Sequence, residues 1–260
     1  MPNLIRRATV CRAISYVENV ETVTRPLDKF GKAVFVLGNF VSKKNSMDQK
    51  ISEIRREYSY KALVESEVET DPMKQFNIWW QDALEAKIAE VNAMTVATAS
   101  ADGMPSARTM LLKGFSEKGF VFFTNYDSYK GQQLAENPKA CLVFFWKELE
   151  RQVRITGLIE KTSKEENDAY FQSRPKASQV GAIASPQSQV IESRDWLDER
   201  YKSLSDQFED GAIQRPLHWG GFLVRPVIIE FWQGRPGRLH DRIQYTILNN
   251  GAWKMERLAP

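Results

Sequence analysis

Apolar residues recur at helical spacing in the segment that follows Asp71-Pro72. An aspartate can cap a helix N-terminus and a proline suits the first turn, so a helix is predicted to begin here. The apolar positions, three or four residues apart, mark one helix face, which predicts packing in the core rather than contact with a cofactor. They are Phe76, Trp79, Trp80, Ala83, Leu84 and Ile88.

Shorter segments rich in β-branched and aromatic residues follow, separated by turn signals. Asp102-Gly103, Lys118-Gly119 and Asn250-Gly251 mark three of these turns. The close strand–turn–strand spacing favours an antiparallel meander closing into a barrel over parallel strands joined by helices. The predicted strands are Ala93–Ala99, Ser106–Lys113, Gly119–Asn125, Ala140–Trp146, Gln152–Ile159, Gly220–Val224, Val227–Gln233, Arg242–Leu248 and Trp253–Arg257.

Further helices are predicted between the strands, over Asp127–Glu136, Ser163–Ser173, residues 175–184 and Ser193–Phe208. Ser163 with Glu166 three residues later forms a capping box, and Pro175 ends that helix. The last helix is amphipathic, with Trp196, Leu197, Tyr201, Leu204 and Phe208 on its apolar side. The expected fold class is mainly β with flanking helices (α+β).

Charge divides the chain near residue 46. Residues 1–46 carry eight Lys or Arg against three Asp or Glu, whereas the remainder carries 28 against 30. The body is not basic, which argues against nucleic-acid binding. The first segment faintly resembles a transit peptide, but a disordered extension or a misassigned start is the favoured interpretation. Residues 47–260 are then expected to form a single domain that begins with a short polar helical arm.

Cysteine and histidine usage excludes several kinds of site. Cys11 and Cys141 provide no disulfide framework, which suits a reducing, cytoplasmic location. With only His218 and His240 besides, no zinc-ligand spacing is present, and no metal is expected. No apolar run approaches the ~20 residues of a membrane span.

The stretch Glu230–Arg242 concentrates candidate chemistry. It contains Trp232, His240 and three arginines, Arg235, Arg238 and Arg242, with two glycines and a proline between them. Arginine forks beside a histidine and a tryptophan suit an anionic, planar ligand. The alternative is a solvated hairpin tip with scattered charge.

Other residues suit phosphate. Alternation puts Arg108 and Lys113 on opposite faces of their strand, so they need not serve one anion. Tyr170 and Arg174 share a helix face, and Ser178 follows just beyond. Together these three make a plausible phosphate cradle, against the alternative of ordinary surface contacts. Gln152, Gln187 and Ser188 are weaker candidates for hydrogen bonds to a heterocycle or phosphate.

Several familiar signatures are missing. The sequence contains no dinucleotide-binding glycine motif, no phosphate loop with its lysine and no nucleophile elbow. A Rossmann cofactor site, a phosphate-loop phosphotransferase and an α/β-hydrolase are therefore not expected.

From about residue 51 to its end, the chain resembles the pyridoxine/pyridoxamine 5′-phosphate oxidase family, with the motifs in order and at compatible spacing. The motifs are Arg108-Thr-Met-Leu-Leu-Lys113, Phe123-Thr124-Asn125, Glu150-Arg-Gln-Val153, Tyr170-Phe-Gln-Ser-Arg-Pro175, Ser178-Gln-Val-Gly-Ala182, Trp219-Gly-Gly221, the stretch Glu230–Arg242, and Glu256-Arg-Leu-Ala-Pro260. The resemblance implies an FMN-binding split β-barrel that forms a homodimer with FMN at the subunit interface.

The resemblance also implies roles for single residues. FMN would be held by Arg108, Thr109, Met110, Leu111, Leu112, Lys113, Phe123, Thr124, Lys130, Gln152, Gln187, Ser188, Trp232 and Arg242. Lys113, Tyr170, Arg174 and Ser178 would bind the substrate phosphate, with Arg238, Leu239 and His240 against the substrate ring. Arg55, Arg56, Glu57 and Tyr58 would close over it as a lid. Arg238 and His240 are the expected catalytic residues, and Asp241 is either a partner of His240 or solvated.

One position departs from the family pattern. Tyr129 precedes Lys130 where the family commonly has an arginine. A phenol donates one hydrogen bond but offers no cationic fork, so weaker FMN binding is expected, by ~1–3 kcal/mol if the charged bond is lost and unreplaced.

The implied reaction oxidises pyridoxine 5′-phosphate and pyridoxamine 5′-phosphate to pyridoxal 5′-phosphate. Hydride passes to FMN, and O2 reoxidises the flavin, giving H2O2. Oxidation of an alcohol or amine needs a two-electron acceptor that no side chain provides. Two alternatives stay open: another FMN-binding split-barrel reductase, and a non-enzymatic carrier of flavin or pyridoxal phosphate.

Overall fold

The computed structural model describes Tyr58, residues 61–209 and residues 211–260. The predicted extension over residues 1–46, and Arg55, Arg56 and Glu57 of the predicted lid, lie outside the described residues. No helix in the described part is long and apolar enough to cross a membrane.

Most predicted elements are present, with ends shifted by a residue or two. The helices are α2 (Pro72–Glu85), α3 (Tyr129–Glu136), α4 (Lys164–Ser173), α5 (Lys176–Ala184) and α6 (Arg194–Gln207), with short 3-10 turns η1 (Glu65–Glu67), η2 (Lys147–Leu149) and η3 (Pro236–Arg238). The strands are β1 (Ala93–Ala99), β2 (Pro105–Leu111), β3 (Gly114–Ser116), β4 (Gly119–Asn125), β5 (Lys139–Trp146), β6 (Arg151–Lys161), β7 (Trp219–Gln233), β8 (Asp241–Ile247) and β9 (Trp253–Arg257).

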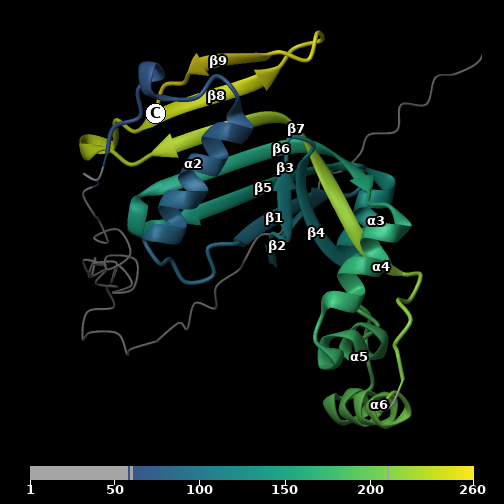
Figure 1. The fold of residues 1–260 in the computed structure, drawn as a ribbon. Helices are drawn as coiled ribbons and strands as arrows, with labels where there is room; N and C mark the ends of the chain where they lie inside the picture. The colour runs from purple at the N-terminus through teal and green to yellow at the C-terminus, as the bar shows by residue number, and fades with distance from the viewer. Residues whose placement is uncertain (1–57, 59–60, 210) are drawn as a thin grey trace, which may run out of the picture. The chain divides into compact units, whose positions relative to one another are not determined.

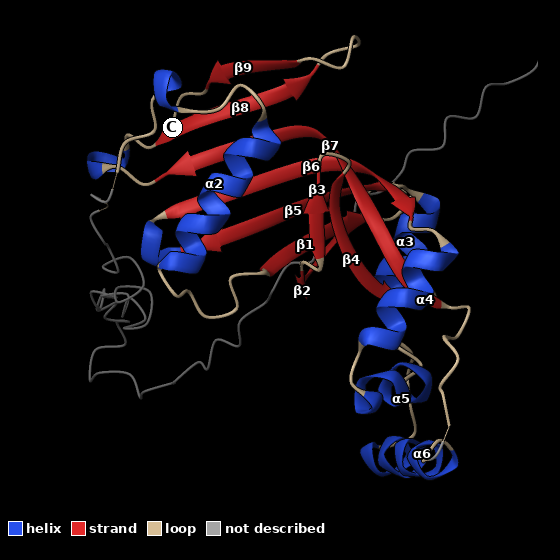
Figure 2. Ribbon diagram, in the orientation of Figure 1, coloured by secondary structure: helices blue, strands red, loops and turns tan. Residues whose placement is uncertain are grey.

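The described strands form one antiparallel sheet whose order is β2-β1-β5-β6-β7-β4-β3, with β8 on β7 and β9 on β8. The sheet curls strongly (Figures 1 and 2). Antiparallel pairing confirms the expectation, but a simple meander is wrong. The strand β4 pairs with β7 rather than with β5, because α3 carries the chain away between them. The three-residue strand β3 was not predicted.

The long strand β7 organises the sheet. Its first half pairs with β4 and its second half with β8, while β6 runs along both. The sequence predicted two strands here, interrupted near Pro226, and this was wrong. Pro226 lies opposite Gly157 where the register shifts, so its missing N–H breaks no regular ladder. A side chain at Gly157 would collide with the backbone oxygen of Arg225, so glycine permits the close approach.

The helix α2 covers one face of the sheet (Figure 1). Asp71 caps it by accepting a hydrogen bond from Met73 N at 2.8 Å, as predicted. Phe76 is fully buried and its ring lies 4.9 Å from that of Phe120, while Trp79 lies 5.1 Å from Phe231. The stripe is core, as expected, except that Leu84 is 45% exposed. Burying one such aromatic ring contributes about 1.5–3 kcal/mol.

The helices α4, α5 and α6 extend from one end of the sheet around a second apolar cluster (Figure 2). Phe171, Val180, Ile213 and Trp219 form its buried part. The capping box of α4 is present. The helix α6 buries none of its residues and ends before Phe208, so its apolar side is less covered than predicted.

Candidate functional site

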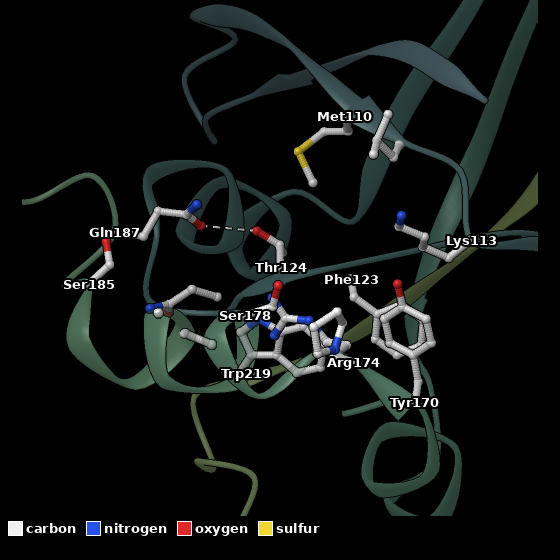
Figure 3. Close-up of a pocket in the computed structure, with 15 residues that line it drawn as sticks. Met110, Lys113, Phe123, Thr124, Tyr170, Arg174, Ser178, Ser185, Gln187 and Trp219 are labelled. Atoms are coloured by element: carbon white, nitrogen blue, oxygen red, sulfur yellow. Dashed lines mark hydrogen bonds between the residues drawn. The ribbon is translucent and has the colours of Figure 1, made fainter. Parts of the chain in front are cut away.

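A pocket of about 630 Å³ opens between the sheet and the helices α4 and α5 (Figure 3). Its lining brings together nine of the predicted site residues: Met110, Leu111, Lys113, Phe123, Thr124, Tyr170, Arg174, Ser178 and Gln187. These come from two strands, two helices and three connecting segments, so the pocket exists only in the folded chain.

Aromatic rings form one wall of the pocket. Tyr170 stacks on Phe123 with ring centres 3.9 Å apart, and Phe123 stacks on Trp219 at 5.5 Å. The Arg174 guanidinium lies over the Trp219 ring at 4.6 Å. This stacking orients the arginine toward the pocket without neutralising its charge.

Arg174 has an unused donor. Its Nη1 is buried and finds no hydrogen-bond partner in the described part of the chain, and burial lowers the pKa of its guanidinium. A buried charged donor without a partner is costly unless a ligand satisfies it. Lys113 and Ser178 line the same space, so the arrangement suits a phosphate.

Lys130, which bonds the pocket residue Thr124, forms a second cationic centre. Lys130 is buried, and its Nζ donates to Thr124 Oγ1 at 3.1 Å, Gln187 Oε1 at 3.2 Å and Ser128 Oγ at 3.4 Å. Burial, followed by the charge of nearby Arg108, lowers the pKa of Lys130 to about 8.

Like Lys130, Arg108 donates its hydrogen bonds only to uncharged groups within the described residues. It donates to Thr98 Oγ1 at 2.7 Å, Ser106 Oγ at 2.6 Å and the Val96 carbonyl at 3.2 Å. Within the described residues, neither Arg108 nor Lys130 forms an ion pair. Two neighbouring cations with only neutral partners favour a bound anion, and a phosphate ester fits these donors.

A row of three predicted residues crosses the other end of the sheet. Trp232 on β7 lies directly opposite Gln152 on β6 and Arg242 on β8. Directly opposed residues project to the same face, so these side chains are neighbours. None of them lines the pocket.

His240 and Tyr58 complete this second region. The His240 ring lies 4.6 Å from Trp232, and Tyr58 meets both rings edge-on at 5.7 Å. The Arg235 N–H donates to His240 Nδ1 at 3.1 Å, so Nδ1 is an acceptor and Nε2 is the nitrogen left for a ligand. Arg238 is exposed, has a left-handed backbone (φ 63°) and makes no hydrogen bond or ion pair within the described residues.

Some expectations for this stretch are corrected. Asp241 does not pair with His240; it accepts from Arg257 at 2.8 Å and from Leu63 N at 3.0 Å. Arg235, one of the three arginines of this stretch, places its Nε 3.5 Å from the Asp241 carboxylate and stays 39% exposed. Arg242 donates at 2.8 Å to Glu230, a buried acid that also pairs with Arg154 and that sequence reasoning missed.

Three predicted FMN residues and one predicted ring contact do not line the pocket of this chain. Leu112 is buried in the core, and Thr109 is exposed on β2. Ser188 has a left-handed backbone (φ 70°) beside Gln187 but does not line the pocket, and Leu239 is 73% exposed. No group of three or more His, Cys, Asp or Glu in the described residues has the arrangement of a metal site.

The curled antiparallel sheet with a helical flank and an anion-suited pocket defines a split β-barrel of the flavin-binding class. A family model described as pyridoxamine 5′-phosphate oxidase matches residues 80–207, and one described as the pyridoxine 5′-phosphate oxidase C-terminal dimerisation region matches residues 219–260. The chain belongs to the pyridoxamine 5′-phosphate oxidase family.

Named relatives agree with this placement. The chain is 55% identical to the pyridoxine/pyridoxamine 5′-phosphate oxidase of Trichormus variabilis, over 82% of this chain and 100% of the relative, and 53% identical to that of Paraburkholderia phymatum, over 81% and 99%. Among solved structures, PhzG from Burkholderia lata, in complex with tetrahydrophenazine-1-carboxylic acid, superposes with a TM-score of 0.73 at 28% identity, covering 78% of this chain and 100% of PhzG. An FMN-binding protein from Nostoc punctiforme shares the fold, with a TM-score of 0.58 at 18% identity, covering 71% and 97%.

Proposed function

We propose that this chain oxidises pyridoxine 5′-phosphate and pyridoxamine 5′-phosphate to pyridoxal 5′-phosphate, with FMN as bound cofactor and O2 as the final acceptor, giving H2O2. Family membership and the names of the relatives support the reaction. The observation that carries the substrate assignment is the buried, unpartnered Nη1 of Arg174 in a pocket that Lys113 and Ser178 share.

FMN, when bound, supplies the two-electron acceptor that no side chain provides. Arg108 and Lys130 fit its phosphate, because both are cations held only by neutral partners. Met110 and Leu111, which line the pocket, and Gln187, which bonds Lys130, would contact the rest of the cofactor. Gln152, Trp232 and Arg242 would contact it from the opposite side.

The two groups of residues need two subunits to meet. Trp219 lines the pocket and Trp232 belongs to the opposite row, yet both lie on β7, thirteen residues apart. At about 3.3 Å per residue they would lie roughly 40 Å apart on a straight strand. We therefore place FMN at a homodimer interface, which the match of residues 219–260 to a dimerisation region supports.

In the substrate site, Tyr170, Arg174, Ser178 and Lys113 would bind the phosphate and so place the substrate ring. Arg238 of the other subunit would lie against that ring, since its guanidinium has no described protein partner. His240 Nε2 is the nitrogen available to exchange a proton with the substrate, because Nδ1 accepts from Arg235 N–H. Tyr58 beside His240 would exclude water above them.

The test is steady-state oxygen uptake with both phosphorylated substrates, with pyridoxal 5′-phosphate measured as product. Arg174→Met should raise KM roughly 10- to 100-fold with FMN retained, because a charged hydrogen bond to phosphate is lost. Arg194→Ala is the matched control, an exposed arginine outside the pocket. An unchanged KM for Arg174→Met would remove the phosphate assignment.

The same assay separates the alternatives. A different split-barrel reductase would turn over substrates that lack the phosphate at least as well, and a carrier would bind flavin without consuming oxygen. We also place the enzyme in the cytoplasm, since its two widely separated cysteines suit a reducing compartment.

A further inference from the structure

Gln133 on α3 is a buried polar residue that no sequence motif singled out; only 2% of it is exposed. Its Oε1 accepts from Thr98 Oγ1 at 2.5 Å and from Ser106 Oγ at 2.6 Å. Its Nε2 donates to the Met104 carbonyl at 3.4 Å. The opposite amide orientation would set two oxygens against each other at Met104, so this carbonyl selects the orientation that places Oε1 toward the hydroxyls.

The direction of the protons follows from this arrangement. The carbonyl oxygen of Gln133 can only accept, and the guanidinium of Arg108 can only donate. Thr98 and Ser106 lie between them, and each has a single hydroxyl proton. The two hydroxyls also lie 3.4 Å from each other, but their contacts with Gln133 Oε1 are much shorter. Both protons therefore point to Gln133, which leaves the lone pairs of both hydroxyls facing Arg108.

These acceptors fix the Arg108 guanidinium along the edge formed by its Nη1 and Nη2 atoms. Its Nη1 protons go to Thr98 Oγ1 and the Val96 carbonyl, and one Nη2 proton goes to Ser106 Oγ. One Nη2–H and the Nε–H have no acceptor within the described residues. A fork held in this way loses little rotational freedom when an anion binds.

We propose that Gln133 is a positioning residue for the FMN phosphate, acting through Thr98 and Ser106 on Arg108. The inference rests on the proposed function, in which Arg108 binds that phosphate. The same helix supplies Lys130 three residues earlier, so α3 provides one phosphate contact directly and orients the other.

The experiment titrates the full-length, flavin-free chain with FMN and with riboflavin, which lacks the phosphate, and follows flavin fluorescence. Gln133→Leu keeps the approximate volume and removes the acceptor. It should weaken FMN binding about tenfold and riboflavin binding less than about twofold, since only the phosphate contact is disturbed.

A double-mutant cycle shows whether the effect passes through Arg108. In an Arg108→Met background, Gln133→Leu should change FMN affinity less than about twofold. An equal loss in both backgrounds, or an equal loss for FMN and riboflavin, would overturn the proposal in favour of a general packing role. Thr98→Val combined with Ser106→Ala tests the same relay if Gln133→Leu fails to fold, and an unchanged FMN affinity in that variant would also overturn it.

Failure of the proposed function gives a different result. If the wild-type chain binds FMN no better than riboflavin, or if Arg108→Met leaves FMN affinity unchanged, the phosphate subsite itself is wrong. If Arg108→Met weakens FMN binding but Gln133→Leu does not, only the role of Gln133 is wrong.

Discussion

Arg257 and Glu65 lie 192 residues apart in the chain and form a two-point ion pair, with Nε and Nη2 donating to the two carboxylate oxygens at 2.6 and 2.7 Å. The same guanidinium donates to Asp241 at 2.8 Å and to the Leu63 carbonyl at 2.8 Å. Arg257 on β9 thus connects Leu63 and Glu65, which follow Tyr58 in the chain, to Asp241 at the start of β8. Asp241 is the residue next to His240. The pairing with Arg257 lowers the pKa of Glu65 to about 2, so the pair is intact above the usual carboxylate range and is lost only as pH falls toward 2.

Arg257→Ala should loosen the segment that holds Tyr58 over His240. The expected result is a rise in substrate KM of about 2- to 5-fold with FMN affinity unchanged, because exposed ion pairs are individually weak. Steady-state kinetics and flavin titration measure both quantities. Arg225→Ala, which breaks the exposed Arg225–Glu160 pair, is the control and should leave KM unaltered. A loss of FMN with no change in KM would contradict this role.

Gly234→Ala should displace Tyr58. A Cβ at Gly234 would lie 2.7 Å from Cγ of the Tyr58 ring, whereas one at Gly211 would meet nothing within 4 Å. Substrate KM should rise for Gly234→Ala and not for Gly211→Ala. In a Tyr58→Ala background the glycine substitution should have no further effect, and a full effect there would show that Tyr58 is not the group displaced.

FMN affinity should depend on the protonation of Lys130. Because the pKa of Lys130 falls from 10.5 to about 8 in the fold, the unfolded chain binds more protons between these values, and the flavin-free fold gains stability as pH rises through that window. Phosphate binds the charged form, so FMN affinity should fall by roughly tenfold per pH unit above about pH 8. Lys130→Met should abolish this pH dependence in a fluorescence titration, and its persistence there would assign it to another group.

Tyr129→Arg should tighten FMN binding, since the added fork lies next to Lys130 at the start of α3. Tyr129 is 50% exposed, so solvent screening places the gain near the lower end of ~1–3 kcal/mol, or about fivefold in Kd. Tyr129→Lys, which adds charge without the planar fork, is the matched comparison. No tightening with either residue would show that this position does not reach the phosphate.

Local signals in the sequence predicted much of the fold. The strands over Ala93–Ala99, Gly119–Asn125 and Trp253–Arg257 have the expected ends, as glycine turns or a change in pattern bound them. Pro226 led to the wrong prediction of two strands, because a proline normally interrupts a strand. It is tolerated within β7 because it lies opposite Gly157, 69 positions earlier in the chain, where the register shifts. Strand order was equally inaccessible, since it depends on long-range pairing.

The residues of the candidate site likewise include some that local sequence predicted and some that it did not. Tyr170, Arg174 and Ser178 line one pocket, although Arg174 follows the end of α4 in an extended conformation and so does not share a helix face with Tyr170 as predicted. Gln133 and Glu230 were missed, because nothing in their local sequence distinguishes a buried polar residue with partners on distant strands from a solvated one. Motif resemblance named residues at both ends of β7 without showing how far apart on that strand they lie.

The most direct measurement is subunit complementation. Arg174→Met alters the pocket and Arg238→Ala alters the opposite end, and both variants should keep their FMN. At a substrate concentration well below the raised KM of Arg174→Met, each homodimer should therefore show little oxygen uptake. Co-expression should yield mixed dimers in which one of the two sites has neither substitution. If each site is built from two subunits, about a quarter of wild-type oxygen uptake should be recovered, because half of the dimers have one intact site each. Activity in the mixture no higher than in the separate variants would contradict a site built from two subunits.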